Sequence, residues 1–219
     1  MSILLINGDS YLLGGITEKF AKQVNCSSVV NLACGGNSNR AITRTTIKYL
    51  ESNLANFVLI GLTFWTRFEL SNKQQWINYS ASGIIHPLGL DRNELLKLNK
   101  YIENRFIYDY DDYMYAEQTI YDILMLSSYL KQRSIKFCIY NSSQIGYNHV
   151  RQDLRESLEK IDNIIPLDKF VANAYLFKSG AESVPADKNL PAEIRHYKHR
   201  DYYHLENYLY DYCANHNII

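Results

Sequence analysis

The chain has 219 residues, of which 47% are hydrophobic and 21% are charged, and this length suits one large domain better than two. Its 23 Lys and Arg residues balance its 23 Asp and Glu residues, so the basic excess typical of nucleic-acid-binding proteins is missing. No apolar run approaches the roughly 18 residues that span a bilayer, and the N-terminus lacks the basic segment of a secretory signal. The sequence therefore predicts a cytoplasmic protein with no nucleic-acid or membrane partner.

Short apolar runs alternate with helical patterns along the chain, which predicts an α/β fold with a largely parallel sheet. We expect strands at residues 3–7, 28–32, 57–62, 135–141 and 164–167. Apolar residues at helical spacing predict helices over 13–24, 38–50 (with Ser38 as N-cap), around 120–130, over 150–161 and over 205–213.

Two segments depart from this alternation. Residues 64–110 are rich in aromatic side chains, and we interpret them as an elaboration between core elements, helical over 92–104. Residues 178–200 are polar, contain Pro185 and Pro191, and predict a long loop. The sequence thus indicates a single domain over 1–219 with an aromatic-rich insertion at about 64–110.

The four cysteines form no CxxC pair and occupy apolar surroundings in the sequence. We expect buried, separate free thiols, with no disulfide and no metal site.

Open α/β sheets bind ligands at the carboxyl ends of their strands, and three predicted strand ends carry reactive or flexible residues. The first strand ends in Asn7-Gly8-Asp9-Ser10, the second in residues 33–39 (ACGGNSN), and the third in Gly61-Leu62-Thr63. Residues Asp201-Tyr202-Tyr203-His204 precede the last predicted helix. We expect these segments to meet at one edge of the sheet.

These residues suit nucleophilic catalysis. A nucleophilic serine needs a base that takes its proton and donors that hold the oxyanion that forms. Ser10 follows a tight turn at Gly8, the Gly35-Gly36 pair offers bare backbone amides, and His204 is a base that Asp201 could orient. Each signal also has a purely structural interpretation, because a Gly-Asp-Ser turn often caps a helix and a Gly-Gly turn often precedes an N-cap.

The ordered set resembles the SGNH (GDSL) hydrolase family, with motifs at residues 4–15, 31–42, 57–64 and 201–209. The resemblance implies Ser10 as nucleophile, Gly36 as an oxyanion-hole amide and Asp201 with His204 as the rest of a triad. It also implies a three-layer α/β/α sandwich with a mainly parallel, flavodoxin-like sheet, and no metal or cofactor.

The third block departs from the family pattern. The family has GxN, whose Asn side chain completes the oxyanion hole, whereas Thr63 stands at that position here. Losing one oxyanion donor costs on the order of 100- to 1000-fold in rate. Thr63 itself, Asn37 and Asn39 are the candidate replacements. In the last block the His leads straight into the helix, so His196 and His199 are alternative bases.

The function implied is a serine esterase that acts on a small ester, with an O-acetylated carbohydrate as one substrate class. Asn37, Trp65 and Trp76 are candidate substrate-binding residues, and Trp65 and Trp76 are alternatively core residues. A second hypothesis is a weak or inactive SGNH scaffold that serves as a binding or structural module, for instance in a virus particle. A third is acyl transfer to a sugar by the same residues. The oligomeric state is not predicted.

Two charged groups allow a local interpretation. An acidic cluster at residues 109–117 is best explained as the solvated N-terminus of a helix. Arg67 and Glu69 are expected to form an ion pair, either at the mouth of the site or on the surface.

Overall fold

The computed structural model describes residues 2–9, 12, 16, 18–72, 75–80, 83–85, 91–108, 111–142, 147–170, 172, 183–184, 196–197 and 202–219.

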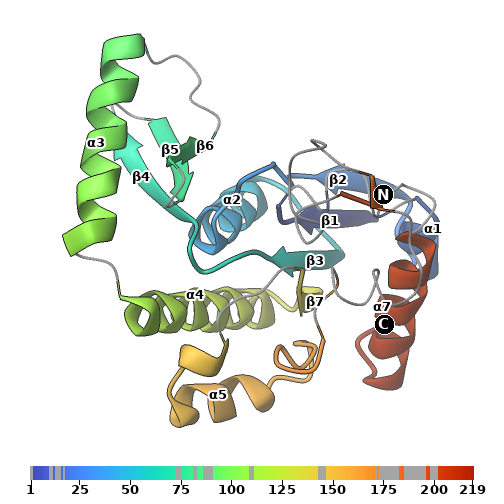
Figure 1. Ribbon diagram of the computed structural model, residues 1–219. Coiled ribbons are helices and arrows are strands. Elements are labelled where there is room, and N and C mark those ends of the chain that lie inside the picture. Colours follow the sequence, from blue (N-terminus) through green and yellow to red (C-terminus); the bar gives the residue numbers. More distant parts are fainter. Residues whose placement is uncertain are drawn as a thin grey trace.

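The centre of the molecule is a four-stranded parallel sheet (Figure 1). Its strands, in the spatial order β2-β1-β3-β7, are β2 (Ser28–Asn31), β1 (Ile3–Asn7), β3 (Phe57–Leu62) and β7 (Lys136–Asn141). All three strand pairs are parallel. The four corresponding predicted strands are confirmed, with β2 ending and β7 beginning one residue inside the predicted limits.

The fifth predicted strand, at residues 164–167, is wrong as a strand. Only a single parallel bridge joins Ile164 to Ile139, with the Ile165 amide donating to the Ile139 carbonyl at 2.9 Å. Pro166 has no N–H to offer a ladder, and its carbonyl instead accepts from the Lys169 and Phe170 amides in a turn. The bridge still lies beside β7, at the place that the fifth strand takes in the flavodoxin-like order.

Helices cover both faces of the sheet (Figure 1). One face carries α1 (Glu18–Gln23) and α7 (Tyr202–Asn215). The other face carries α2 (Asn39–Ser52), α4 (Asp112–Gln132) and α5 (Gln152–Glu159). The expected three-layer α/β/α sandwich is therefore confirmed.

Alternating strand residues supply the two cores. Leu4 and Ile6 of β1 pack in the cluster that contains Phe20 of α1, whereas Leu5 packs in the cluster that contains Ile42 of α2. Successive strand side chains point to opposite faces, so a sheet covered on both sides needs apolar residues at every position. The solidly apolar β1 and β3 sequences follow from that requirement.

Two helices begin at side-chain caps. The Ser38 hydroxyl accepts from the Ala41 amide at 3.1 Å, which confirms the predicted N-cap of α2. Asp111 caps α4 by accepting from the Tyr113 and Met114 amides at 2.8 and 3.1 Å. The part of the acidic cluster that the structure describes thus marks a helix start, as expected.

The aromatic-rich insertion forms its own layer of structure beyond α2 and α4 (Figure 1). It contains an antiparallel sheet of β4 (Phe68–Asn72), β5 (Gln75–Ser80) and β6 (Gly83–Ile85), followed by α3 (Arg92–Tyr108). The predicted helix is confirmed and continues four residues further, but the three-stranded sheet was not predicted.

Three short elements complete the description: η1 (Tyr147–His149), β8 (Ser183–Val184) and β9 (His196–Tyr197). The last two pair as an antiparallel ladder, so the long loop predicted at 178–200 contains strand structure. In the described part of the chain, none of the helices combines the length and the hydrophobicity that a membrane span requires.

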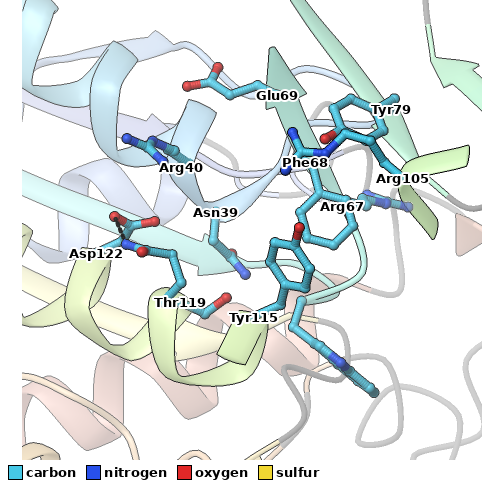
Figure 2. Close-up of a pocket in the computed structure, with 12 residues that line it drawn as sticks. Asn39, Arg40, Arg67, Phe68, Glu69, Tyr79, Arg105, Tyr115, Thr119 and Asp122 are labelled. Atoms are coloured by element: carbon cyan, nitrogen blue, oxygen red, sulfur yellow. Dashed lines mark hydrogen bonds between the residues drawn. The ribbon is translucent and has the colours of Figure 1, made fainter. Parts of the chain in front are cut away.

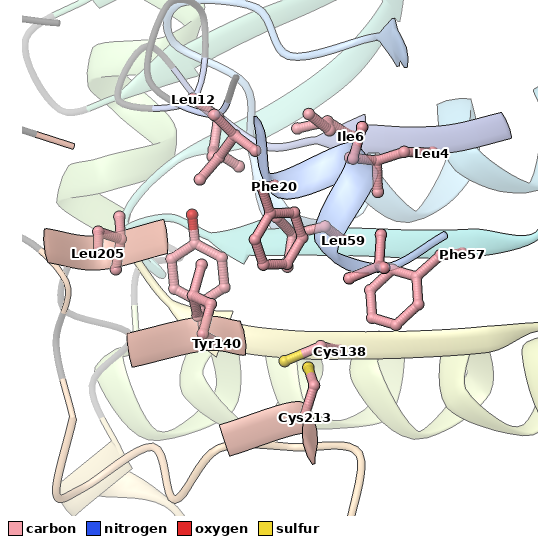
Figure 3. Close-up of a cluster of buried hydrophobic side chains, with 14 of the residues drawn as sticks. Leu4, Ile6, Leu12, Phe20, Phe57, Leu59, Cys138, Tyr140, Leu205 and Cys213 are labelled. Atoms are coloured by element: carbon pink, nitrogen blue, oxygen red, sulfur yellow. The ribbon is translucent and has the colours of Figure 1, made fainter. Parts of the chain in front are cut away.

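The cysteines are all free, and Cys26, Cys138 and Cys213 are buried. Cys34 is exposed, contrary to expectation, because it lies in the turn after β2. Cys138 of β7 and Cys213 of α7 are not separate but lie side by side in the core (Figure 3). A hydrogen bond with the Cys213 thiol and, to a lesser extent, burial raise the pKa of Cys138.

Candidate active site

The carboxyl ends of three neighbouring strands meet around one buried carboxylate. Asp9, just after β1, is fully buried. Its Oδ2 accepts from the Thr63 hydroxyl at 2.9 Å, and its Oδ1 accepts from the Ser142 hydroxyl at 3.2 Å. Thr63 follows β3 and Ser142 follows β7, so this carboxylate joins the ends of β1, β3 and β7 immediately before Ser10 in the chain.

Arg67 balances the charge of this buried carboxylate. Its Nη1 lies 3.3 Å from Asp9 Oδ2 and donates to the Thr63 hydroxyl oxygen at 2.7 Å. The expected Arg67–Glu69 ion pair is wrong, since Glu69 instead binds Arg44 with contacts of 2.9 to 3.2 Å. Arg67 lies just before β4, outside the strand, and its side chain reaches back to Asp9 at the sheet edge.

The first turn has no room for a side chain at Gly8. A Cβ there would lie 2.4 Å from Leu12 Cδ1 and 2.9 Å from the Gly61 carbonyl oxygen. The chain after β1 therefore passes close against the end of β3. This close approach is what brings Asp9 within reach of Thr63.

The second loop is bonded directly to this turn. The Gly8 carbonyl accepts from the Cys34 amide at 3.2 Å and from Asn37 Nδ2 at 3.0 Å. Between these two donors Gly36 is buried and has φ of 78°, a left-handed conformation that favours glycine. The glycine expected to supply an oxyanion-hole amide thus lies in a turn held against the residue two positions before Ser10.

Asn39 fixes the end of β3. Its Oδ1 accepts from the Thr63 amide at 2.8 Å, and its Nδ2 donates to the Thr63 carbonyl at 2.9 Å. The polar groups of Asn37, Asn39 and Thr63, expected as candidate oxyanion donors, all bond to neighbouring parts of the protein in this structure. Since a hydroxyl has one hydrogen, the Thr63 bond to Asp9 uses its only donor.

The first turn of α7 lies at the same edge of the sheet. Tyr208 stacks on Phe170 at 4.2 Å between ring centroids, and Phe170 contacts Tyr140 near the end of β7 at 6.4 Å. Further along α7, Cys213 contacts Cys138, so the helix runs antiparallel to β7 (Figure 3). The expectation that His204 precedes the last helix is wrong, because α7 begins at Tyr202. His204 lies in its first turn, one turn before Tyr208, and is exposed at this edge.

The other predicted triad residues, Ser10 and Asp201, lie outside the described residues, as does the alternative base His199. For the other alternative base, His196, the structure describes only the backbone, in β9. The triad and its oxyanion hole therefore stay predictions.

The two tryptophans occupy different surroundings. Trp65 Nε1 donates to Asp112 Oδ1 at 2.9 Å, and its ring lies 5.9 Å from that of His149. Trp76 on β5 is half exposed, and the Arg44 guanidinium lies over its ring at 4.6 Å from the centroid. Of the two, Trp65 borders a cavity.

That cavity, of about 150 Å³, opens between α2, α4 and the insertion (Figure 2). It is lined by Asn39, Arg40, Trp65, Arg67, Phe68, Glu69, Tyr79, Arg105, Tyr115, Gln118, Thr119 and Asp122. The sequence predicts roles for Asn39, Trp65, Arg67 and Glu69 among these residues, but it does not predict the cavity. Arg40, Tyr115 and Asp122 lie on α2 and α4. The sequence pattern of a helix predicts its buried face but not the segment that packs against it.

Burial perturbs two titratable groups in the cavity wall. It raises the pKa of the Asp122 carboxyl, against the opposing effects of Arg40 and of a hydrogen bond from Gln118 at 3.3 Å. It also raises the pKa of Tyr79.

Comparisons with known proteins agree on the fold. The chain is similar in structure to the psychrotrophic esterase EstA from a Pseudoalteromonas species, with a TM-score of 0.51, 10% sequence identity, and 98% of each chain covered. It is also similar to TesA, with a TM-score of 0.51, 13% identity, and 98% of this chain and 99% of TesA covered. A member of the lipolytic G-D-S-L protein family from Veillonella parvula gives a TM-score of 0.47 at 10% identity, with 98% and 97% covered. No family model matches the sequence, and no curated protein matches it.

These structural matches run over nearly the full length of the chain, and the architecture described above is the one they share. The chain therefore has the SGNH-hydrolase fold that the sequence motifs predicted.

Proposed function

We propose that this protein is a serine esterase of SGNH type that acts on a small acyl ester. The observation that carries the proposal is the joint anchoring of the two loops. The Gly8 carbonyl receives hydrogen bonds from Cys34 and Asn37, on either side of Gly36. This arrangement supports a nucleophile at Ser10 that lies beside an oxyanion-hole amide from Gly36.

In the proposed reaction, Ser10 Oγ attacks the ester carbonyl carbon while His204 takes the hydroxyl proton. Collapse of the tetrahedral intermediate breaks the bond to the alkoxy oxygen, and His204 returns the proton to the leaving alcohol. Water, activated by the same histidine, then hydrolyses the acyl-serine. Asp201 holds the histidine tautomer and stabilises its charged form.

The oxyanion hole we propose consists of the Ser10 and Gly36 amides. Thr63 stays the candidate for the third position by sequence, but its hydroxyl hydrogen is bonded to Asp9. Thr63 joins the hole only if its hydroxyl turns away from Asp9. Without a third donor, we expect a slower enzyme than one with the family's Asn, by about two orders of magnitude.

The substrate class we propose is a short acyl ester, with the acetyl ester of a carbohydrate hydroxyl as the leading case. Two considerations support it: the SGNH fold, and an aromatic-lined cavity next to the sheet edge. A cavity of this size favours one small ring over a long acyl chain.

Steady-state hydrolysis of a short-chain aryl acetate tests the proposal. We expect Ser10→Ala to lower kcat/KM by at least 1000-fold, because the nucleophile is removed. Ser128→Ala, at an exposed position on α4, is the matched control and should keep wild-type rates. Equal rates for wild type and Ser10→Ala would overturn the proposal.

One observation favours a second candidate function, a non-catalytic scaffold. Thr63 replaces the family's Asn, and its hydroxyl supports the buried turn instead of facing a substrate. Under this hypothesis the Asp9 cluster has only a structural role. The protein would then fail to hydrolyse any ester even when Thr63→Asn restores the family residue.

A further inference from the structure

Three arginines line the cavity of Figure 2: Arg40 of α2, Arg67 just before β4 and Arg105 of α3. Both hydrogen bonds that Arg67 makes within the described part of the chain use Nη1, so its Nε–H and Nη2–H groups are left for another acceptor. The Arg67 side chain is 16% exposed and lines the cavity. Arg40, in the first turn of α2, is exposed on the cavity wall. A planar pair of oxygens suits such groups, because guanidinium binds carboxylate in a bidentate fashion.

Acidic residues also lie against these arginines, since Asp9 pairs with Arg67 and both Glu69 and Asp122 line the wall. Glu69 is bound through both oxygens to Arg44, and its side chain is 1% exposed. Asp122 is buried, and burial raises the pKa of its carboxyl against the lowering effect of Arg40. The N-terminal end of α2, which carries partial positive charge, also opens toward this wall.

The remaining wall is aromatic. Phe68 contacts Tyr115 at 4.3 Å and Tyr79 at 5.5 Å between ring centroids, and Trp65 borders the same space. The cavity volume of about 150 Å³ is that of a cavity known to hold one benzene molecule, so it accommodates a single six-membered ring. Aromatic walls pack against the apolar faces of a sugar ring while polar side chains bind its hydroxyl groups.

The cavity is one side chain away from the proposed nucleophile turn. Arg67 bonds to Asp9, the residue before Ser10, and Asn39 in the cavity wall holds both the amide and the carbonyl of Thr63. A ring bound in the cavity would therefore lie beside the sheet edge where the ester is proposed to react.

We propose that this cavity is the binding site for the alcohol part of the substrate, and that this alcohol is a monosaccharide unit that carries a carboxylate. Arg40 and Arg67 bind the carboxylate, and the aromatic wall holds the ring. The inference rests on the proposed esterase function, which it deepens by naming the substrate class.

A ligand-observed NMR titration with glucuronate and glucose tests the binding directly. We expect glucuronate to bind at least tenfold more tightly than glucose, since only glucuronate carries the charged acceptor. Arg40→Gln should weaken glucuronate binding about tenfold. Lys48→Gln, which removes the same charge from an exposed position further along α2, should leave it unchanged. Equal binding of the two sugars, or no effect of Arg40→Gln, would overturn the proposal.

Two further experiments distinguish a carboxylate site from a phosphate site and test the shape of the binding group. Glucose 6-phosphate that binds more tightly than glucuronate would show a phosphate site and overturn the carboxylate assignment. Circular dichroism of Arg40→Gln must match wild type, and Arg40→Lys, which keeps the charge but loses the fork, should recover part of the glucuronate affinity. Full recovery of the affinity by Arg40→Lys would contradict the bidentate binding proposed.

Kinetics then distinguish this inference from the proposed function. We expect a lower KM for an acetylated methyl glucuronide than for the matching acetylated glucoside. Hydrolysis of an aryl acetate with no preference between the two sugars would overturn the inference alone. Glucuronate binding without hydrolysis of any of these esters would instead overturn the proposed esterase function.

Discussion

Asp9 is a fully buried carboxylate whose stability depends on its hydrogen-bond partners. Its carboxylate accepts hydrogen bonds from Thr63, Ser142 and Arg67, which come from two other strand ends and the start of the insertion. A buried charge is tolerated only when it is paired and hydrogen-bonded. Asp9 therefore links the geometry of the proposed nucleophile turn to the elements around it.

Replacing this carboxylate with an amide should be strongly destabilising. We expect Asp9→Asn to lower the free energy of unfolding by about 3–5 kcal/mol, because Arg67 would lose its buried partner. Urea denaturation measures the change. Asp153→Asn removes a carboxylate that pairs with Arg151 at the surface, and should change stability by less than about 1 kcal/mol. Similar values for the two variants would contradict the role assigned to Asp9.

Asp122 should make stability depend on pH. Burial raises the pKa of its carboxyl in the folded state above the ordinary value of 3.8. The folded state then holds a proton that the unfolded state releases, so this contribution to stability is fully present below 3.8 and is lost as pH rises through the folded pKa.

Asp122→Asn should remove this dependence. We expect the stability of the variant relative to wild type to increase as pH rises from about 4 to about 7. Thermal unfolding across this range checks the sign. Asp211→Asn, at an exposed position on α7, controls for the loss of one negative charge. A gain for Asp122→Asn that shrinks with rising pH would show that an attractive partner dominates over burial.

At the scale of elements, the insertion is held to the sandwich by aromatic contacts. Phe68 of β4 contacts Phe106 of α3 at 5.5 Å and Tyr115 of α4 at 4.3 Å. This ring therefore joins the small sheet, the insertion helix and the core helix. The wall of the cavity depends on the same contacts.

Removing that ring should loosen the insertion first. We expect Phe68→Ala to cost about 3 kcal/mol, near the lower end for phenylalanine truncation because the residue is half-buried. Hydrogen exchange should show lost protection in β4 and β5, with β1, β3 and β7 unchanged. Leu96→Ala, on an exposed face of α3, should leave protection as it was. Uniform loss across both sheets would mean that the insertion and the core unfold together.

The elements that sequence predicts well are those that local chemistry determines. β1 and β3 are solidly apolar because both of their faces are covered, and Ser38 caps α2 through its own hydroxyl. The small antiparallel sheet was missed because its stability comes from contacts with α3 and α4, which are distant in sequence. The fifth strand was overpredicted because an apolar run was given more weight than the Pro166 within it.

The candidate site was likewise predicted only in part. The motif residues at the strand ends were found because parallel strands bring their carboxyl ends to one edge. The partners of Arg67 and Glu69 were not, because charge type does not specify which of several nearby groups a side chain reaches. The cavity depends on the packing of the insertion against two helices, which no local pattern records.

For the molecule as a whole, the buried thiols report on how firmly α7 closes over the sheet. Cys26, Cys138 and Cys213 are buried, and Cys34 is exposed. Burial raises the pKa of Cys26 and contributes to the raised pKa of Cys138, so both disfavour the reactive thiolate.

We expect one thiol per native chain to react rapidly with a chromogenic disulfide reagent, and all four to react after denaturation. The Cys34→Ser variant should show no rapid phase. Rapid reaction of Cys138 or Cys213 in the native protein would mean that α7 opens readily from the sheet. That motion would carry His204 away from the proposed site.

The central claim is that the molecule holds an activated serine at residue 10. Its most direct test is labelling with a fluorophosphonate, which requires an activated hydroxyl and not a good substrate. After tryptic digestion, mass spectrometry would locate the adduct within residues 1–19, where fragmentation separates Ser10 from Ser2. We predict one adduct per chain, on Ser10, that is absent from His204→Ala and from Ser10→Ala. A folded protein that takes up no label, or an adduct on another serine, would contradict the account.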